Sequence, residues 1–310
     1  MSEYNTNYNL YLPSYSIGPD CYREIPYVTR FFGKTAAVIG GKTAMSKAEK
    51  ALLDGVAGSE VKLLGFFEYG GDSTYENGDA LIANPTVRDA DMIFAVGGGR
   101  ACDTCKYVAD KLDKPLFTFP TVASNCASVT AISVIYNPDG SFREYYYPKL
   151  TNHCFINSAV IADSPESLLW AGIGDALSKE YEAVFSSKDD TLSHTPLMCK
   201  QISRICTDPL TEYGAKALES IREKKASFAL DQVTLDIIIS TGIVSNMMST
   251  VDDYYYNSTL AHCVYYGSTV TEHGHRHLHG EVVSLGVLCL LEFEQNADEV
   301  GRIMKFNNSI

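Results

Sequence analysis

Short apolar runs alternate with stretches of helical spacing between about residue 34 and residue 162. This alternation predicts a parallel α/β sheet, in which helices connect successive buried strands. The predicted strands are KTAAVIGG (34–41), EVKLLGFF (60–67), DMIFAVGGG (91–99), PLFTFPT (115–121) and HCFINSAVIAD (153–163). Between them, TAMSKAEKALLDGVA (43–57) and CDTCKYVADKL (102–112) carry apolar residues at the spacing of a helix.

The pattern differs in two other parts of the chain. Residues 132–147, ISVIYNPDGSFREYYY, contain two β-rich runs joined by an Asn-Pro-Asp-Gly turn and predict a hairpin. In ADSPES, Ser164 as N-cap, Pro165 at the first helical position and Glu166 in the first turn predict the start of a helix. Helical segments without strand-like alternation follow near residues 165–187, 194–221, 226–250, 256–268 and 279–295. We therefore predict an α/β domain over residues 1–163 and an all-helical domain over residues 164–310.

The composition is that of an ordinary globular protein, and the net charge limits the classes of partner that we expect. Of the 310 residues, 45% are hydrophobic and 20% are charged, and the formal net charge is −13. A surface of that charge repels polyanions, so we expect neither nucleic acid nor a membrane as partner. The nine cysteines show no disulfide spacing, the N-terminus has no secretory signal, and the longest apolar runs are about half the length that spans a bilayer. Together these features predict a cytoplasmic protein with reduced thiols.

Gly97, Gly98 and Gly99 stand between an apolar run and a helical stretch in IFAVGGGRACDTCKYVAD. Glycine lets backbone N–H groups approach an anion, and a helix N-terminus adds a favourable dipole, so this turn is able to hold a pyrophosphate. It matches no standard nucleotide-binding fingerprint, and a tight strand-to-helix turn explains it equally well. Cys102 and Cys105 form a C-x-x-C without a second pair, and we interpret them as helix-packing residues.

One carboxylate and two imidazoles, remote from one another in sequence, are candidates for a metal site. GIGDALSKEYEA places Asp175 beside glycines at a predicted helix start, with Lys179 and Glu182 on the same face. His262 and His279 stand at the edges of apolar helical segments. Such a set suits Zn²⁺ or Fe²⁺ with open positions for a substrate oxygen. The same residues are explained equally well if Asp175 caps a helix and both histidines are solvated. Because the three residues are far apart in sequence, no ligand spacing decides between the two interpretations.

Several motifs occur in a characteristic order along nearly the whole chain. They are the strand-GGG-x-x-x-D-T-x-K helix that ends at Lys106, PTVAS, SVIYNPDGSFREYY, GIGDALSKEYEA, AHCVYYGSTV and HLHGEVVSLGVLCLLE. Together they resemble the glycerol dehydrogenase branch of the iron-containing (group III) alcohol dehydrogenase superfamily. The resemblance implies a dehydroquinate synthase-like fold, with an N-terminal Rossmann-like domain that binds a nicotinamide cofactor, a helical C-terminal domain, and a metal in the cleft between them.

The resemblance also implies roles for individual residues. The metal ligands, and hence the catalytic residues, would be Asp175, His262 and His279, with His273, His275 and His277 as neighbours. The cofactor contacts would come from Gly97, Gly98, Gly99 and Asp103 around the pyrophosphate and from Thr121, Ser124, Thr130, Ile132 and Tyr136 on the nicotinamide side. The implied reaction interconverts a small alcohol or polyol and its carbonyl by hydride transfer, with Zn²⁺, or alternatively Fe²⁺, as the Lewis acid.

Two departures from the family pattern concern specificity. Family members carry A-S-T-D after the Pro-Thr, whereas this chain reads ASNCAS and places Cys126 where an aspartate contacts the polyol. A thiol does not accept a hydrogen bond as a carboxylate does, so we do not assign glycerol as the substrate. Gly40, Gly41 and Lys42 stand where an acidic residue often binds the adenosine ribose, so NADP is an alternative to NAD.

The chain ends at RIMKFNNSI, whereas family members usually continue for several more helices. We expect a natural short form or a truncated chain, with apolar surface exposed on the helical half and reduced stability or dependence on a partner chain. The resemblance also implies a homo-oligomer.

Two alternative functions stay open. A glycerol-1-phosphate dehydrogenase or a dehydroquinate synthase-like enzyme acts on a phosphorylated substrate and needs a basic pocket, of which the helical half shows no obvious sign apart from Arg276. A homologue that binds cofactor without turnover agrees with Cys126 and the short C-terminus. The complete Asp-His-His set opposes this second alternative.

Overall fold

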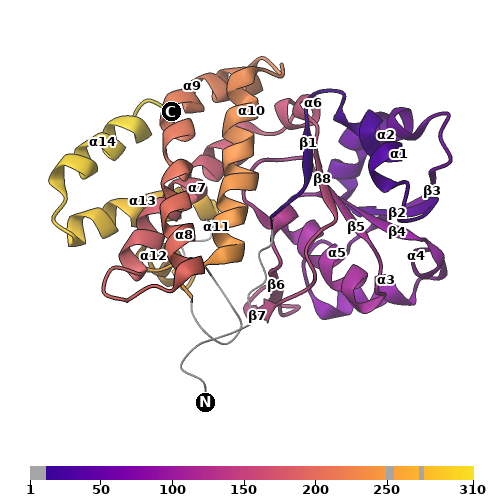
Figure 1. Cartoon of the computed structure of the whole chain (residues 1–310), viewed down its shortest axis with the longest axis horizontal. Coiled ribbons are helices and arrows are strands. Elements are labelled where there is room, and N and C mark those ends of the chain that lie inside the picture. The colour runs from indigo at the N-terminus through magenta and orange to yellow at the C-terminus, as the bar shows by residue number, and fades with distance from the viewer. Residues whose placement is uncertain (1–11, 249–254, 272–275) are drawn as a thin grey trace. The chain divides into compact units, whose positions relative to one another are not determined.

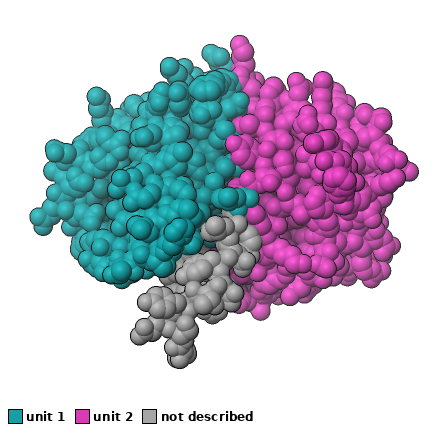
Figure 2. All heavy atoms as spheres, viewed as in Figure 1, with its two compact units in different colours: residues 1–12, 165–223, 227–310 teal, residues 13–164, 224–226 magenta. Residues whose placement is uncertain are grey.

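The computed structural model describes residues 12–248, 255–271 and 276–310. They form two compact units, one of Pro13–Ser164 with Lys224–Ala226 and one of Pro165–Glu223 with Ser227–Ile310 (Figure 2). The assignment of a dinucleotide-binding role to residues 1–163 and of a metal-binding role to residues 164–310 stays a prediction.

A six-stranded parallel sheet lies at the centre of the first unit, in the order β1-β8-β5-β4-β2-β3 (Figure 1). Its strands are β1 (Tyr15–Ile17), β2 (Thr35–Gly40), β3 (Lys62–Glu68), β4 (Met92–Gly97), β5 (Leu116–Pro120) and β8 (His153–Ile156). Strands β4 and β5 are buried throughout, and β2 is buried except for its first residue. Their sequences are therefore continuous apolar runs, because both faces of the sheet are covered.

Successive side chains of one strand enter two separate apolar layers. Val38 of β2 belongs to the same buried cluster as Leu52 of helix α2, whereas Ile39 belongs to the cluster of Val108 of helix α5. The helices of this unit are η1 (Cys21–Glu24), α1 (Ile25–Thr29), α2 (Lys42–Val56), α3 (Tyr75–Ala83), α4 (Pro85–Asp89), α5 (Gly99–Lys111), η2 (Ala127–Val129) and α6 (Ser158–Ala162). The predicted hairpin is confirmed as the antiparallel pair β6 (Ser133–Tyr136) and β7 (Phe142–Tyr146).

Among the residues that the structure describes, the second unit contains helices and no β-strand. They are α7 (Glu166–Ser186), α8 (His194–Ile202), η3 (Ser203–Cys206), α9 (Asp208–Arg222), α10 (Phe228–Leu235), the π-helical η4 (Asp236–Ser240), α11 (Thr241–Met247), α12 (Leu260–Ser268), α13 (His279–Phe293) and α14 (Ala297–Asn307). The predicted fold class, a parallel α/β part followed by an all-helical part, is therefore confirmed.

One helical run, Phe228–Met247, is long and apolar enough to cross a membrane by length and composition alone. It lies within the helical segment predicted over residues 226–250, whose longest uninterrupted apolar runs are shorter than a membrane span. Of its most apolar window, 61% is buried inside the structure, as in a core helix of a globular protein.

Several sequence-based boundaries are wrong, and two of them have a local cause. The predicted strand 153–163 ends at Ile156, because the Asn157 side chain accepts hydrogen bonds from the next N–H groups and caps α6. The predicted helix 194–221 is divided into α8, η3 and α9, and Pro209, which has no N–H to donate, lies in the first turn of α9. Helix α7 begins at Glu166, with Pro165 rather than Ser164 as its N-cap.

Helices α7 and α13 cross so closely that only glycine fits at the contact. A Cβ atom at Gly280 of α13 would lie 1.7 Å from the carbonyl oxygen of Ala171, and one at Gly174 of α7 would lie 2.3 Å from the carbonyl oxygen of Gly280. The obstacles are backbone atoms, which no side-chain rotation removes. The crossing therefore fixes the separation of the two helices beside Asp175 and His279.

We predict that Gly280→Ala lowers the free energy of unfolding by about 3 kcal/mol, at the upper end of the usual cost of overpacking, because the two helix backbones must separate. Urea denaturation measures this difference. Gly301→Ala in α14 is the matched control, since a Cβ there meets no atom within 4 Å. It should change stability by less than about 1 kcal/mol. Equal stability of the two variants would contradict the close crossing.

Candidate metal centre and dinucleotide turn

Three side chains that are remote in sequence converge in the helical unit. Asp175 comes from the middle of α7, His262 from α12 and His279 from the first position of α13. The expectation that Asp175 begins a helix is wrong. Gly172 and Gly174 lie inside α7, where Gly174 serves the close crossing with α13 rather than a helix start.

The donor atoms of these three residues lie within 4.8 Å of one another. Asp175 Oδ1 is 3.1 Å from His279 Nε2 and 3.7 Å from His262 Nε2. Ligands about 2.0–2.2 Å from one ion stand roughly 3.0–3.5 Å apart in tetrahedral or octahedral geometry. Among the residues that the structure describes, no other group of three or more His, Cys, Asp or Glu side chains converges this closely. The donor set and its spacing fit a divalent transition metal.

Electrostatics favour the ionised form of the Asp175 carboxyl. Burial by itself raises the pKa of Asp175, but the neighbouring His279, His262 and Lys179 outweigh burial and lower it to about 2. The side chain is only 11% exposed. A buried carboxylate facing two imidazole nitrogens provides the negative charge that a cation site requires.

Glu182 is a partner of this site that the sequence analysis noted but did not assign. Its side chain is fully buried, and its Oε2 lies 2.5 Å from His262 Nδ1. Its Oε1 accepts hydrogen bonds from the backbone N–H groups of Thr259 (2.6 Å) and His262 (3.0 Å). Burial raises the pKa of Glu182, whereas the His262 imidazole and these N–H groups lower it, and the net shift is downward. The i+7 spacing from Asp175 on α7 is the sequence signal that points to Glu182.

The remaining histidines of the HGHRHLH run differ in position. His277 is 49% exposed, and its Nδ1 lies 2.7 Å from Glu281 Oε1 in the first turn of α13, so it belongs to the start of that helix. His273 and His275 lie outside the described residues. His279 also packs against the ring of Tyr265, with ring centroids 4.2 Å apart, a contact that its sequence context did not indicate.

The triple glycine occupies the turn from β4 to α5, as predicted. Gly97 has φ +145°, and Gly98 is the N-cap of α5. A Cβ atom at Gly99 would lie 2.8 Å from Asn125 Nδ2 in the loop after β5. The turn therefore needs glycine both for its conformation and for the approach of that loop. In parallel sheets of this kind, ligands bind at the carboxyl ends of the strands, which is where this turn lies.

Asp103 and Lys106 of α5 form a buried ion pair, with Lys106 Nζ 2.8 Å from Asp103 Oδ1. The Lys106 ammonium also donates to Thr130 Oγ1 (3.2 Å) and to the carbonyl oxygen of Ile132, while Asp103 Oδ2 accepts from the Val134 N–H (3.2 Å). The pair thus holds residues 130–134 beside α5. Asp103, expected to support the glycine turn, is oriented toward this segment.

The other residues expected near the cofactor lie in the loop after β5 and in or just before β6. Thr121 follows β5 directly, and its N–H donates to the carbonyl oxygen of Gly97 at 3.3 Å. Tyr136 ends β6, with the Arg100 guanidinium 5.4 Å from its ring centroid. Ser124 and Cys126 are half-buried in the loop after β5. The structure therefore brings the predicted cofactor residues into one region of the α/β unit.

Cys102 and Cys105 are buried free thiols within α5. Burial raises the pKa of Cys102 to about 12, so its reactive thiolate form is not populated at neutral pH. These properties agree with the interpretation of the C-x-x-C as helix packing.

Comparison with known proteins gives concordant results. The family model for iron-containing alcohol dehydrogenase matches residues 13–164. A glycerol dehydrogenase of Thermotoga maritima is 32% identical over 230 residues, which cover 72% of this chain and 60% of that protein. Glycerol dehydrogenase 1 of Schizosaccharomyces pombe is 31% identical over 281 residues, which cover 88% of this chain and 60% of that protein. A crystal structure of glycerol dehydrogenase from Schizosaccharomyces pombe superposes with a TM-score of 0.86 at 25% identity, covering 98% of this chain and 77% of that one.

The chain is a glycerol dehydrogenase-like member of the iron-containing alcohol dehydrogenase superfamily. This membership confirms the resemblance found in the sequence. The chain spans 60% of the length of each of these two curated relatives. Two structural features of this chain indicate its function within the superfamily. They are the convergence of Asp175, His262 and His279 and the turn formed by Gly97 to Gly99.

We predict that Lys106→Met destabilises this superfamily member by about 3–5 kcal/mol, because it leaves the Asp103 carboxylate buried without its cation. Urea denaturation checks the loss, and the double variant Asp103→Leu/Lys106→Met should recover most of it. Lys111→Met on the same helix is the control. Lys111 lies 5.3 Å from the Tyr146 ring centroid at the surface, a contact worth about 1 kcal/mol or less. Equal losses for Lys106→Met and Lys111→Met would disprove the ion-pair argument.

Proposed function

We propose that this protein is a cytoplasmic, metal-dependent, NAD-linked dehydrogenase that interconverts a small alcohol or polyol and its carbonyl. The reaction balances as alcohol plus NAD⁺ giving carbonyl, NADH and a proton. The observation that carries the proposal is the convergence of one carboxylate and two imidazoles from α7, α12 and α13 in a member of this superfamily.

The proposed metal ligands are Asp175 Oδ1, His262 Nε2 and His279 Nε2, and Zn²⁺ is the proposed ion, with Fe²⁺ as the alternative. Three protein ligands leave a coordination position open, and the bound ion supplies Lewis-acid polarisation of the substrate oxygen. Asp175 contributes the negative charge, and its burial keeps competing water away. The two imidazoles come from helices that the α7–α13 crossing and the packing of α12 on α13 hold in place.

The proposed cofactor site is the turn Gly97 to Gly99 at the start of α5. The N–H groups of this helix start are available to a pyrophosphate, and the Lys106–Asp103 pair holds residues 130–134 where the nicotinamide side is proposed. The contacts proposed for Thr121, Ser124, Thr130, Ile132 and Tyr136 follow the family pattern. NAD is the proposed dinucleotide, and the assay below includes NADP⁺.

The proposed substrates are small, unphosphorylated hydroxy compounds. Besides the glycerol dehydrogenases, similar proteins include one named glycolaldehyde reductase, 28% identical, and one named hydroxycarboxylate dehydrogenase A, 31% identical. Cys126, half-buried in the loop after β5, is proposed on the substrate side, where its thiol is a poorer hydrogen-bond acceptor than a carboxylate. Compounds with fewer hydroxyl groups than glycerol are therefore expected to react best. A homo-oligomer is proposed from the family pattern.

We predict that dialysis against a chelator abolishes NAD⁺ reduction by a panel of diols, polyols and hydroxy acids, and that added Zn²⁺ or Fe²⁺ restores it. NADP⁺ and phosphorylated polyols complete the panel. His279→Ala and Asp175→Asn should each lower kcat/KM by at least about 100-fold, since a lost ligand costs both metal affinity and activity. Turnover that survives the chelator, or that needs a phosphorylated substrate, would reject the proposal.

Binding of the dinucleotide is a separate prediction, because it needs no metal chemistry. Gly99→Ala should weaken NADH binding by about 10-fold, since its Cβ displaces Asn125 and alters the turn. Enhancement of NADH fluorescence on titration measures the dissociation constant. Gly301→Ala serves as control and should bind NADH as the unchanged protein does. Unaltered affinity in Gly99→Ala would remove this turn from the cofactor site.

A further inference from the structure

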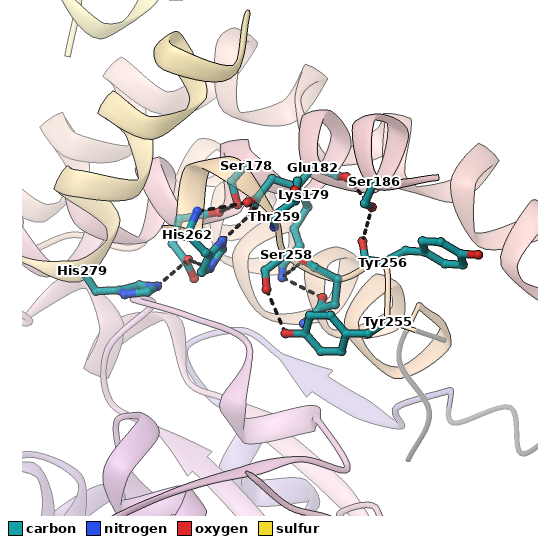
Figure 3. Close-up of polar contacts among 12 residues, drawn as sticks. Ser178, Lys179, Glu182, Ser186, Tyr255, Tyr256, Ser258, Thr259, His262 and His279 are labelled. Atoms are coloured by element: carbon teal, nitrogen blue, oxygen red, sulfur yellow. Dashed lines mark hydrogen bonds and ion pairs between the residues drawn. The ribbon is translucent and has the colours of Figure 1, made fainter. Parts of the chain in front are cut away.

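The segment that leads into α12 lies along one face of α7. Three side chains of that face hold it by hydrogen bonds: Ser186 Oγ to the carbonyl oxygen of Tyr256 (3.1 Å), Lys179 Nζ to Asn257 Oδ1 (2.8 Å), and Glu182 Oε1 to the N–H of Thr259 (2.6 Å). Figure 3 shows the contacts of Ser186 with Tyr256 and of Glu182 with Thr259 and His262. These contacts attach three positions of the segment to one helix, so α7 fixes where α12 begins.

Glu182 makes the contacts nearest to the metal centre, and they use both of its oxygens. Thr259 is the N-cap of α12, and its side chain makes no capping bond. Glu182 Oε1 fulfils that function from another helix, because it accepts the N–H groups of Thr259 and His262. Its Oε2 is thereby directed at His262 Nδ1 at 2.5 Å. One fully buried carboxylate thus fixes both the start of the helix and the imidazole that it carries.

We infer that Glu182 is a positioning residue that holds His262 in the tautomer with the proton on Nδ1, so that the lone pair of Nε2 faces Asp175 and the ion. This inference rests on the proposed function, because it concerns the proposed ligand His262. Carboxylates that accept the other ring N–H of a histidine ligand fix its orientation and increase its basicity. Glu182 itself does not touch the ion.

The chemistry of the side chain makes the inference specific to a carboxylate. A carboxylate offers acceptors on both oxygens, as two backbone N–H groups on one side and Nδ1–H on the other require. A glutamine of the same shape offers one acceptor and one donor. Its oxygen can satisfy the two backbone N–H groups, but its NH₂ group then faces Nδ1 and favours the tautomer with the proton on Nε2. That proton occupies the position at which the ion binds.

Glu182→Gln is therefore the decisive variant. It should unfold within about 1–2 kcal/mol of the unchanged metal-free protein, since the cap of α12 is retained. Its affinity for Zn²⁺, titrated against a competing chelator, should fall by about 10- to 100-fold. Nitrogen chemical shifts of the ¹⁵N-labelled, metal-free protein, at a pH where the histidines are neutral, should show the His262 proton moving from Nδ1 to Nε2.

Two further variants separate positioning from general stability. Tyr181→Phe, on the same helix, removes a hydroxyl that contacts Glu299 (2.5 Å) and Arg302 (2.9 Å) and should leave Zn²⁺ affinity and the His262 tautomer unchanged. Glu182→Asp keeps two acceptor oxygens on a shorter side chain. It should retain the Nδ1–H tautomer, with an affinity between those of the unchanged protein and Glu182→Gln. This variant also provides the test if Glu182→Gln does not fold.

Three results would overturn the inference: unchanged Zn²⁺ affinity in Glu182→Gln, an unchanged His262 tautomer in that variant, or weaker binding by Glu182→Asp than by Glu182→Gln. Failure of the proposed function gives a different result. If the unchanged protein binds no Zn²⁺ or Fe²⁺, or binds one without turnover, the dehydrogenase proposal fails. The tautomer of His262 in the metal-free proteins still reports whether Glu182 sets it.

Discussion

The close crossing of α7 and α13 is the constraint on which the proposed metal centre depends. Each helix presents a glycine to the backbone of the other, so the helices approach more closely than any side chain would allow. Asp175 directly follows one of these glycines, and His279 directly precedes the other. A carboxylate and an imidazole that are 104 positions apart are thus brought to 3.1 Å by backbone contact rather than by attraction between them. Helix packing sets the positions of these two side chains, and their electrostatic interaction follows from the resulting short distance.

Packing alone would leave two negative charges buried on one helix, Asp175 and Glu182. A buried charge is costly unless it is paired, and each of these carboxylates faces an imidazole nitrogen. Asp175 Oδ1, however, lies near both imidazoles, 3.1 Å from His279 Nε2 and 3.7 Å from His262 Nε2, and the charge of Lys179 stabilises the carboxylate further. The cation proposed for this site would complete this arrangement of nitrogen and oxygen donors. The pairing of Glu182 with the opposite nitrogen of His262 keeps that ring from turning away.

The sequence predicts the parts of the fold in which local pattern and tertiary packing agree. Strands β2, β4 and β5 are buried on both faces, so their apolar runs identify them, and the Asn-Pro-Asp-Gly turn identifies the hairpin. Prediction fails where one polar residue overrides the pattern, as Asn157 does when it converts the end of an apolar run into a helix cap. It also misread the glycines around Asp175 as a helix start, because a glycine required by a neighbouring helix cannot be distinguished in sequence from one that ends a helix. The three proposed ligands were named only through resemblance, since no local spacing connects them.

The sequence contains Glu182 and Lys106 within predicted helices. Their roles, however, are to hold segments that lie far away in the chain, and local sequence does not reveal those contacts. In α5, Asp103 accepts a backbone N–H of residues 130–134, and Lys106, three positions later, donates to carbonyl oxygens of that segment. In α7, Glu182 accepts a backbone N–H of the segment before α12, and Lys179, three positions earlier, donates to the carbonyl oxygen of Asn257. Residues 130–132 and 256–259 lie outside helices and strands, and side chains of the neighbouring helix supply hydrogen-bond partners for backbone groups of both stretches. An acid and a lysine three positions apart on a buried helix face supply one acceptor and several donors to such a segment. Residues 130–134 carry two of the residues proposed to contact the cofactor, and the segment before α12 leads to the proposed ligand His262, so both are places where the backbone must be held rigidly.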